Sequence, residues 1–368
     1  MSLRILVAAG GTGGHVLPAL TMARALKARL PDASCEAVSG ERGVASQLWD
    51  RSLGELTTIS VRPWPRLQEL VNPRYWWRQG RATLQLVRLL ARFKPQVVIG
   101  FGGYVSGPTV LLAKLTGSRT VIHEQNVFPG RTTRMLVSWA DRVAVSFEET
   151  RQHLPAKATV TVTGNPVRSG VAGVSREMAL KTLGLVSRTP VLLVMGGSQG
   201  SRTINAVCVE AMALVPPRQR RTFQLLHLTG PHDLPWVTER YRALGIEGRT
   251  MAYLDEMGPA YAAATLAVAR AGATTLAELV ATGTPSVLVP YPYAGAHQVA
   301  NAQWLSSRGG AWLVDQQALS PEHFAERVMS LLTDAAQLDR MRQALQGLSV
   351  PGAAERLADA VLEMAHAG

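Results

Sequence analysis

The chain has 368 residues, of which 47% are hydrophobic, and it carries a formal net charge of +12. This length exceeds the usual size of one core and suits two domains, while the apolar content argues against a disordered protein. No apolar run approaches the roughly 20 residues of a membrane-spanning helix, and the short apolar start does not match a signal peptide, so we expect a cytoplasmic protein.

Strand-like runs alternate with helical patterns along the whole chain, as parallel βαβ units require. The expected strands are residues 4–8, 37–39, 57–61, 97–100, 120–123, 142–145 and 160–163, followed by 191–195, 224–228, 250–253, 266–269, 286–290 and 311–314. The turn Asn165-Pro166 interrupts this pattern and indicates a domain boundary.

The predicted fold class is therefore α/β, with two Rossmann-like domains whose parallel sheets face each other across a cleft. We expect an N-terminal domain over residues 1–166 and a C-terminal domain over 167–345. Residues 346–368 are expected to form a helix that packs back toward the N-terminal domain.

Two glycine-rich turns, residues 10–14 and 196–200, each stand directly after a buried strand and directly before a helix. The unpaired N–H groups of a helix start make such a turn an anion site. Neither turn matches a dinucleotide fingerprint or a Walker A loop, and a tight packing turn explains either one alone equally well. Two of them half a chain apart favour phosphate binding.

His15 adds chemistry to the first turn because it lies in the first turn of the following helix. The helix macrodipole disfavours the cationic imidazole there, so the side chain stays neutral and can act as a base. A capping or packing histidine is the alternative interpretation.

Polar loops follow two further strands of the first half. Phe101-Gly102-Gly103-Tyr104 comes after one of them, and His123-Glu124-Gln125-Asn126 after the other. Val127 stands where a zinc-binding His-Glu-x-x-His motif needs its second histidine. Because ligands bind at the carboxyl ends of parallel strands, these loops indicate a polyhydroxylated acceptor, although each one alone could be a polar turn.

The second half carries polar groups of another kind. Glu278 lies about one turn inside the helix after Gly272, where a carboxylate can accept bonds from both hydroxyls of a ribose; a solvated helix charge is the alternative. His297, Gln298 and Asn301 share one helical face. Together with the second glycine turn they predict a nucleotide-diphosphate pocket.

The sequence has no Asp-x-Asp pair to hold a metal against a diphosphate, so we expect no metal. Backbone N–H groups of the second turn and the Arg168 side chain would stabilise the leaving charge instead.

The positive charge comes mostly from arginine, which suits phosphates and anionic lipid headgroups. Nucleic acid is the other partner that this charge favours, but no helix-turn-helix, zinc-finger or RNP motif accompanies it. Aromatic and cationic side chains alternate in one stretch, and they predict a membrane-surface patch. The patch consists of Trp64, Trp76, Trp77, Arg78 and Arg81. A core edge or a dimer contact is the alternative.

Taken in succession, seven motifs resemble the MurG family of bacterial N-acetylglucosaminyltransferases, glycosyltransferase family 28. These motifs are Gly10 to His15, Phe101 to Tyr104, His123 to Asn126, Thr163 to Arg168, Gly196 to Gly200, Arg270 to Glu278, and His297 to Ala302. The resemblance spans nearly the whole chain. It departs at Ala271, where the family often has serine, so that one hydroxyl contact is lost.

The resemblance implies the GT-B fold and transfer of N-acetylglucosamine from UDP-N-acetylglucosamine onto undecaprenyl-diphosphoryl-N-acetylmuramoyl-pentapeptide (lipid I), giving lipid II for peptidoglycan. It further implies inversion at the sugar carbon, no metal or other cofactor, no nucleic acid partner, and peripheral attachment to the anionic cytoplasmic face of the inner membrane. A UDP-sugar 2-epimerase of the same architecture and a transferase acting on diacylglycerol are the alternatives, and a basic nucleic-acid-binding protein is the non-enzyme one.

The resemblance also implies site residues. The general base would be His15 or Glu124, and the acceptor would contact Thr12, Gly13, Gly14, Tyr104 and Asn126. Glu278 would hold the ribose, the Leu254 backbone the uracil, and Gln298 with His297 the donor sugar. The donor set is Asn126, Arg168, Ser198, Gln199, Leu254, Ala273, Thr274, Glu278, His297 and Gln298.

Overall fold

The computed structural model describes residues 2–41, 44–62, 71–197, 199–293 and 297–366. The chain divides into two compact units, the first formed by Met1–Arg168 with Val350–Gly368 and the second by Ser169–Ser349. The second unit therefore runs a few residues beyond the expected 345, because helix α14 (Ala335–Leu348) continues without a break to Leu348.

The first unit is built on a seven-stranded sheet in the order β3-β2-β1-β4-β5-β6-β7, and all paired strands are parallel. The strands are β1 (Arg4–Ala8), β2 (Ser34–Gly40), β3 (Leu56–Ile59), β4 (Val97–Gly100), β5 (Arg119–Glu124), β6 (Arg142–Val145) and β7 (Val160–Val162). The central strands are apolar and buried along their length, as helices on both faces of a parallel sheet require.

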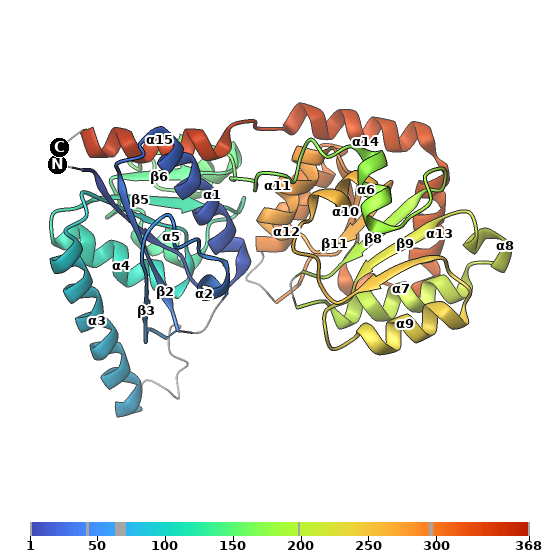
Figure 1. The fold of residues 1–368 in the computed structure, drawn as a ribbon, viewed down its shortest axis with the longest axis horizontal. Helices are drawn as coiled ribbons and strands as arrows, with labels where there is room; N and C mark the ends of the chain where they lie inside the picture. Colours follow the sequence, from blue (N-terminus) through green and yellow to red (C-terminus); the bar gives the residue numbers. More distant parts are fainter. Residues whose placement is uncertain (1, 42–43, 63–70, 198, 294–296, 367–368) are drawn as a thin grey trace. The chain divides into compact units, whose positions relative to one another are not determined.

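The helices of the first unit cover both faces of this sheet. They are α1 (Gly13–Arg29), α2 (Ala45–Leu48), α3 (Pro73–Phe93), α4 (Gly103–Leu115), α5 (Arg131–Leu136), η2 (Glu148–His153) and α15 (Ala353–His366). Ile5 and Val7 of β1 pack in one cluster with residues of α1 and α15, while Leu6 and Ala8 pack in another with residues of α3 and α4. The chain's last helix thus lies beside its first (Figure 1).

The second unit repeats the plan with a six-stranded parallel sheet in the order β10-β9-β8-β11-β12-β13. Its strands are β8 (Val191–Met195), β9 (Gln224–Leu228), β10 (Gly248–Met251), β11 (Leu266–Ala269), β12 (Ser286–Leu288) and β13 (Ala311–Leu313). The predicted class, two parallel-sheet α/β units, is confirmed.

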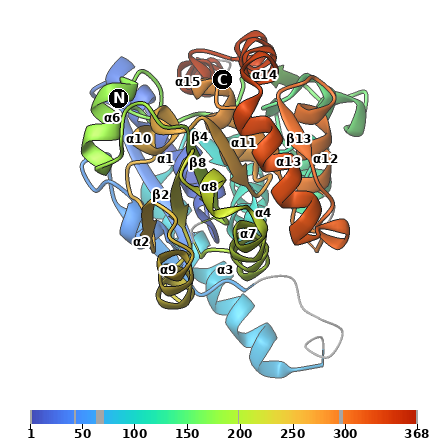
Figure 2. The ribbon, with the colours of Figure 1, turned by 90° about the vertical axis from the view of Figure 1, so that its right-hand side faces the viewer.

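The helical elements of the second unit are α6 (Arg176–Leu183), α7 (Arg202–Leu214), α8 (Pro217–Arg220), α9 (Leu234–Ala243), α10 (Gly258–Ala263), α11 (Ala273–Thr282), α12 (His297–Ser306), η3 (Gln316–Ala318), α13 (Pro321–Thr333) and α14. One apolar cluster joins the sheet to α7 and α13, through side chains such as Ile204 and Phe324. Figure 2 gives a second view of these helices, turned by 90° from Figure 1.

Helix α3 is amphipathic. It begins with Asn72, whose side chain accepts from the Arg74 N–H, and it ends at Lys94 in the left-handed conformation. Its apolar stripe packs under β3 and α4, while Trp76 and Trp77 face outward. Both views show α3 projecting beyond the sheet of its own unit (Figures 1 and 2). In the described part of the chain, no helix combines the length and apolar character that crossing a bilayer requires.

Candidate functional site

The first candidate site lies where the strand order of the first unit reverses. β1 pairs with β2 on one side and with β4 on the other, so the turns that follow β1 and β4 meet at the carboxyl edge. They meet closely, because a Cβ on Gly103 would lie 2.9 Å from the Gly10 carbonyl oxygen. Gly102 and Gly103 also have positive φ angles of 88° and 73°, which disfavour any other residue.

His15 is the third residue of α1 and is half-buried at this junction. Its Nδ1 lies 3.1 Å from the Gly10 carbonyl oxygen. A carbonyl only accepts, so Nδ1 carries the proton and Nε2 carries the lone pair. A Cβ on Gly102 would lie 3.2 Å from Nε2, which places the reactive nitrogen against the turn that follows β4.

Four other predicted acceptor residues belong to the same two turns and to the helix starts that follow them. Thr12 is exposed and precedes α1 without a side-chain capping bond, and Gly13 and Gly14 form the first residues of the helix. The Tyr104 ring lies against the end of β2, since a Cβ on Gly40 would be 2.6 Å from its hydroxyl oxygen. The structure therefore gathers Thr12, Tyr104 and His15 at one edge of the sheet.

The carboxylate of Glu124, the second candidate base, accepts hydrogen bonds from the segment that follows it. Its Oε1 accepts from the backbone and side-chain N–H groups of Asn126, at 2.9 and 3.0 Å. Its Oε2 accepts from the Gly130 N–H at 2.8 Å and the Thr133 hydroxyl at 2.5 Å. The carboxylate is only 3% exposed, so it fixes the loop that carries Asn126 at the carboxyl end of β5.

His123, directly before it, is fully buried and neutral. Its Nε2 lies 3.2 Å from the Gly164 carbonyl oxygen, and its Nδ1 accepts from the Gln125 amide at 3.0 Å. Burial lowers the pKa of His123 to about 4, and the neighbouring His15 acts in the same direction. His123 therefore adds no positive charge beside His15 at neutral pH.

The second candidate site lies at the corresponding reversal in the second unit, where β8 is flanked by β9 and β11. The turn after β8 packs too tightly for a side chain at two of its glycines, Gly196 and Gly200. A Cβ on Gly200, whose φ is 76°, would lie 2.1 Å from the Thr229 carbonyl oxygen. Gln199 of this turn is exposed, and Ser198 lies outside the described residues.

Arg270, to which the sequence analysis gave no role, brings a cation to this turn. It follows β11 and is 9% exposed. Its guanidinium donates to the Ser201 hydroxyl at 2.8 Å and to the Val289 carbonyl at 3.0 Å, and it stacks over the Tyr291 ring. Burial lowers its pKa, but arginine remains charged at neutral pH. The sequence signal that could have identified Arg270 is a single arginine directly after an apolar strand.

The predicted ribose carboxylate lies beside the same strand. α11 begins at Ala273 and Thr274, immediately after β11, and Glu278 is its sixth residue. Glu278 is 5% exposed, and its Oε2 accepts from the Tyr261 hydroxyl at 2.8 Å. Leu254, the predicted uracil residue, follows β10 and is half-buried.

The predicted sugar residues are tied to the same edge. Gln298, at the start of α12, accepts the Tyr291 N–H on Oε1 at 2.9 Å. Asn301 is fully buried and donates to the Ala271 carbonyl at 3.1 Å. His297 is half-buried at the first position of α12, and the three residues before it lie outside the described part. Arg168, the last predicted donor residue, is half-buried and ends the continuous part of the first unit.

Both halves of the chain match known domain families. Residues 5–145 match the glycosyltransferase family 28 N-terminal domain, and residues 191–357 match the family's C-terminal domain. The chain belongs to glycosyltransferase family 28. A relative from Desulforudis audaxviator is 38% identical over the full length of both chains. It is named UDP-N-acetylglucosamine--N-acetylmuramyl-(pentapeptide) pyrophosphoryl-undecaprenol N-acetylglucosamine transferase.

Solved structures agree with this family 28 assignment. The crystal structure of Acinetobacter baumannii MurG is 25% identical, with a TM-score of 0.77, over 99% of this chain and 100% of that one. The crystal structure of a UDP-N-acetylglucosamine 2-epimerase gives a TM-score of 0.66 at 15% identity, over 100% and 98% of the two chains. The second similarity concerns the fold alone.

This family 28 chain also exposes large apolar side chains on its first unit. They are Trp76, Trp77, Leu84 and Val87 of α3, with Leu115, Met135 and Trp139 in or near α4 and α5. Arg78 and Arg81 are exposed on α3, and Arg81 stacks over Trp77. Trp64 lies outside the described residues. The sequence analysis did not single out Leu115, Met135 and Trp139. In the structure α4 packs both on α3 and on α5.

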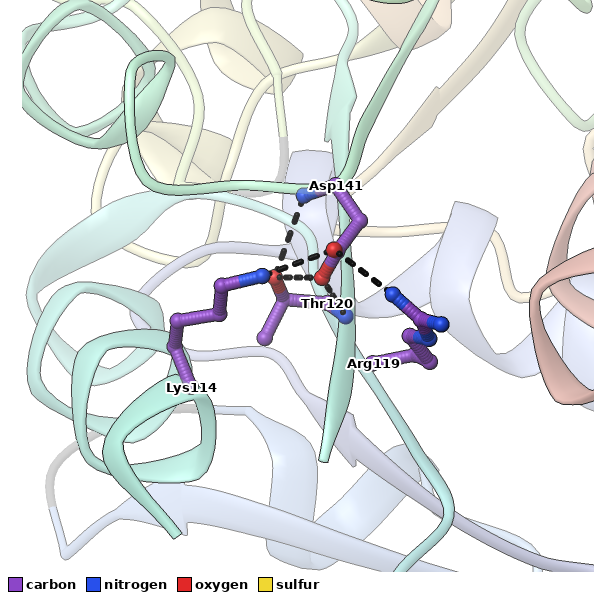
Figure 3. Close-up of polar contacts among 4 residues, drawn as sticks. All are labelled: Lys114, Arg119, Thr120 and Asp141. Carbon is purple, nitrogen blue, oxygen red and sulfur yellow. Dashed lines mark hydrogen bonds and ion pairs between the residues drawn. The ribbon is translucent and has the colours of Figure 1, made fainter. Parts of the chain in front are cut away.

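One carboxylate, that of Asp141, holds two cationic side chains, Lys114 at the end of α4 and Arg119 at the start of β5 (Figure 3). Asp141 accepts from Lys114 at 2.7 Å and lies 3.4 Å from Arg119. Its other oxygen accepts from the backbone and hydroxyl of Thr120, each at 2.9 Å. Burial raises the pKa of Asp141, but these bonds outweigh that effect and hold it below its ordinary value. The charge cluster fixes the end of α4 to the start of β5.

Proposed function

We propose that this glycosyltransferase moves N-acetylglucosamine from UDP-N-acetylglucosamine to undecaprenyl-diphosphoryl-N-acetylmuramoyl-pentapeptide, forming the disaccharide lipid of peptidoglycan synthesis. The observation that carries the proposal is the full-length similarity to relatives named for this transfer. The positions of the polar residues support it, since both glycine turns stand where the strand order of a parallel sheet reverses.

The second unit binds the donor in this proposal. The N–H groups of the turn after β8 and the Arg270 guanidinium face the diphosphate. The family resemblance adds Ser198 and, from the end of the first unit, Arg168 as further contacts. Glu278 accepts the ribose hydroxyls, and the Leu254 backbone reads the uracil. Gln298, positioned by the Tyr291 N–H, holds the sugar together with His297. A buried cation beside a helix start suits the charge that develops on the leaving UDP.

The first unit binds the acceptor and supplies the base. Thr12, Gly13, Gly14, Tyr104 and Asn126 contact the acceptor. As the acceptor hydroxyl oxygen bonds to the anomeric carbon, its proton passes to Nε2 of His15. The bond from that carbon to the phosphate oxygen breaks, and UDP leaves with the electron pair. Attack opposite the leaving group inverts the anomeric carbon.

The contacts favour His15 over Glu124 as this base. The proton on Nδ1 leaves Nε2 with the lone pair, and the position near the start of α1 disfavours the cation before reaction. Glu124 already accepts from four donors of its own loop. Proton abstraction by Glu124 would need those bonds to break, so we assign it the positioning of Asn126.

Peripheral attachment to an anionic membrane on its cytoplasmic face completes the proposal. Trp76 and Trp77 are 54% and 65% exposed, and arginines flank them. Interfacial aromatics with headgroup-seeking cations bind such surfaces. Replacing both tryptophans with serine should reduce co-sedimentation with anionic vesicles severalfold, whereas Leu214→Ser, at a 52% exposed site of the second unit, should not. Equal sedimentation of both variants would contradict attachment through α3.

The transfer itself is tested with radiolabelled UDP-N-acetylglucosamine offered to the lipid-linked muramoyl-pentapeptide, to diacylglycerol, or to no acceptor. We expect label in the lipid-linked disaccharide only. Label in a glycolipid from diacylglycerol would identify the other acceptor. Conversion of the nucleotide sugar to its 2-epimer without acceptor would identify an epimerase.

A further inference from the structure

Tyr261 lies directly behind the predicted ribose carboxylate. It belongs to α10, is 2% exposed, and donates its hydroxyl to Oε2 of Glu278 at 2.8 Å. The sequence analysis gave it no role, because it stands in an alanine-rich apolar run. Its oxygen also lies 3.8 Å from Sδ of Met195, the last residue of β8. The hydroxyl is therefore placed between the strand that leads into the glycine turn and the helix that carries Glu278.

A phenol is well suited to orient a buried carboxylate. The single hydroxyl proton goes to the carboxylate, a far stronger acceptor than the Met195 thioether, and the bond to a charged acceptor is worth more than a neutral one. A carboxylate offers about four acceptor positions on its two oxygens, and the Tyr261 hydroxyl uses one position of Oε2. A phenol is also neutral, so it leaves the negative charge of the carboxylate in place to attract hydroxyl donors, whereas an arginine or lysine partner would neutralise that charge.

Packing and one hydrogen bond together fix the Tyr261 side chain. A cavity of about 540 Å³ is lined by Tyr261 together with Arg176, Thr265 and Arg342. Because Tyr261 is only 2% exposed, its ring is packed on its sides, and the hydroxyl bond to Glu278 locates its tip. In turn, a buried glutamate side chain has three rotatable bonds, and a bond at Oε2 selects one arrangement.

We propose that Tyr261 is a positioning residue for the nucleotide, which aims Glu278 at the 2′- and 3′-hydroxyls of the ribose and thereby sets the preference for ribonucleotide donors. The proposal rests on the ribose role of Glu278 stated under the proposed function. Tyr261 does not touch the reacting atoms, so its loss weakens donor binding more than it slows the chemical step.

The test compares Tyr261→Phe with Tyr241→Phe. Tyr241 is 4% exposed in the same unit, and its hydroxyl lies 2.9 Å from Nδ1 of His227, so its variant also loses one buried hydroxyl bond. Binding of UDP and of 2′-deoxy-UDP is measured by calorimetry. We expect the unaltered enzyme to prefer UDP by about 10-fold or more, as one hydrogen bond to a charged group allows.

In Tyr261→Phe this preference should shrink toward 1, and KM for the nucleotide sugar should rise about 10-fold with kcat within about 3-fold. Tyr241→Phe should keep the preference of the unaltered enzyme. A preserved preference in Tyr261→Phe would overturn the positioning role while leaving the transferase proposal intact. No preference in the unaltered enzyme would instead remove the ribose role of Glu278.

A second variant protects the test against loss of folding. Removing the hydroxyl leaves a buried carboxylate short of a donor, which costs stability. Glu278→Gln removes that charge, so Tyr261→Phe combined with Glu278→Gln should fold where the single variant does not. In the Glu278→Gln background, adding Tyr261→Phe should change the UDP preference by less than about 2-fold. An additive further loss would show that Tyr261 acts independently of Glu278.

Discussion

The two glycine turns use one backbone arrangement for different chemistry. Both follow the first strand of their unit, at the reversal of strand order, and both precede a helix. The turn after β1 presents an imidazole, His15, whose Nδ1 donates to the turn's own carbonyl. The turn after β8 is capped by Ser201, which accepts from the Ile204 N–H and from the buried Arg270 guanidinium. The neighbours of a turn, rather than its glycines, decide whether it handles a proton or an anion.

Removing the base of the first turn should have the largest effect. His15→Ala should lower kcat by about 10²- to 10⁴-fold, because general-base catalysis contributes that much. Steady-state transfer assays measure it. Glu124→Gln should mainly lower the thermal stability, since it weakens the loop's bonds to a charged acceptor. A folded Glu124→Gln protein that loses more kcat than His15→Ala would reverse the assignment.

Acid should destabilise both units through their buried histidines. Burial lowers the pKa of His123 to about 4 and that of His227 to about 3. The unfolded chain, with histidine near its ordinary value, binds more protons, so stability falls as the pH drops below about 6.5. Between pH 6.5 and 4.5 each histidine should cost about 2 kcal/mol.

At still lower pH the loss of stability should differ between the two units. Below about pH 4 the loss from His123 levels off, while His227 continues to destabilise the second unit toward pH 3. Hydrogen exchange resolved by segment measures each unit separately. His227→Gln should flatten the acid response of the second unit only, and a response unchanged by this substitution would exclude His227 as its source.

Substituting alanine for glycine should distinguish the packing of the two turns. Gly11 and Gly200 both have positive φ, so alanine is strained at either position, by about 1–2 kcal/mol. At Gly11 the nearest atom to a new Cβ is 3.8 Å away, but at Gly200 it is a carbonyl oxygen at 2.1 Å. Gly200→Ala should therefore cost about 2 kcal/mol more than Gly11→Ala in the free energy of unfolding. Denaturant titration measures both, and equal costs would contradict the tight packing of the second turn.

The smallest expected effect concerns the cation of the second turn. Arg270→Met should weaken UDP binding about 10-fold, because one charge-assisted interaction with the diphosphate is lost. Uridine binding should stay within about 2-fold. Arg308→Met removes another stacked arginine of the same unit, over Trp304, and provides the control. Equal weakening of uridine and UDP would place the effect of Arg270 in the fold instead of the phosphates.

The sequence predicted the sheet scaffold well, because each central strand is a short apolar run that ends in glycine or a polar loop. The runs around β1, β4, β8 and β11 fall on the observed strands. Site chemistry was harder to predict. The sequence analysis preferred His15 as the base and kept Glu124 as its competitor, since the sequence does not state which hydrogen bonds a carboxylate has already accepted. Tyr261 was missed because its apolar surroundings in sequence conceal a polar partner 17 residues away in the chain.

What the sequence by itself determined is the order of strands and helices, the two glycine turns and the family, because these depend on local periodicity, backbone freedom and motif succession. Only the tertiary structure decided which side chains meet. In the tertiary structure Glu124 accepts from the Thr133 hydroxyl, and Arg270 donates to Ser201. The Tyr261 hydroxyl donates to Glu278. The physical reason is that hydrogen bonding and burial between distant segments arise only after parallel strands bring their carboxyl ends to one edge.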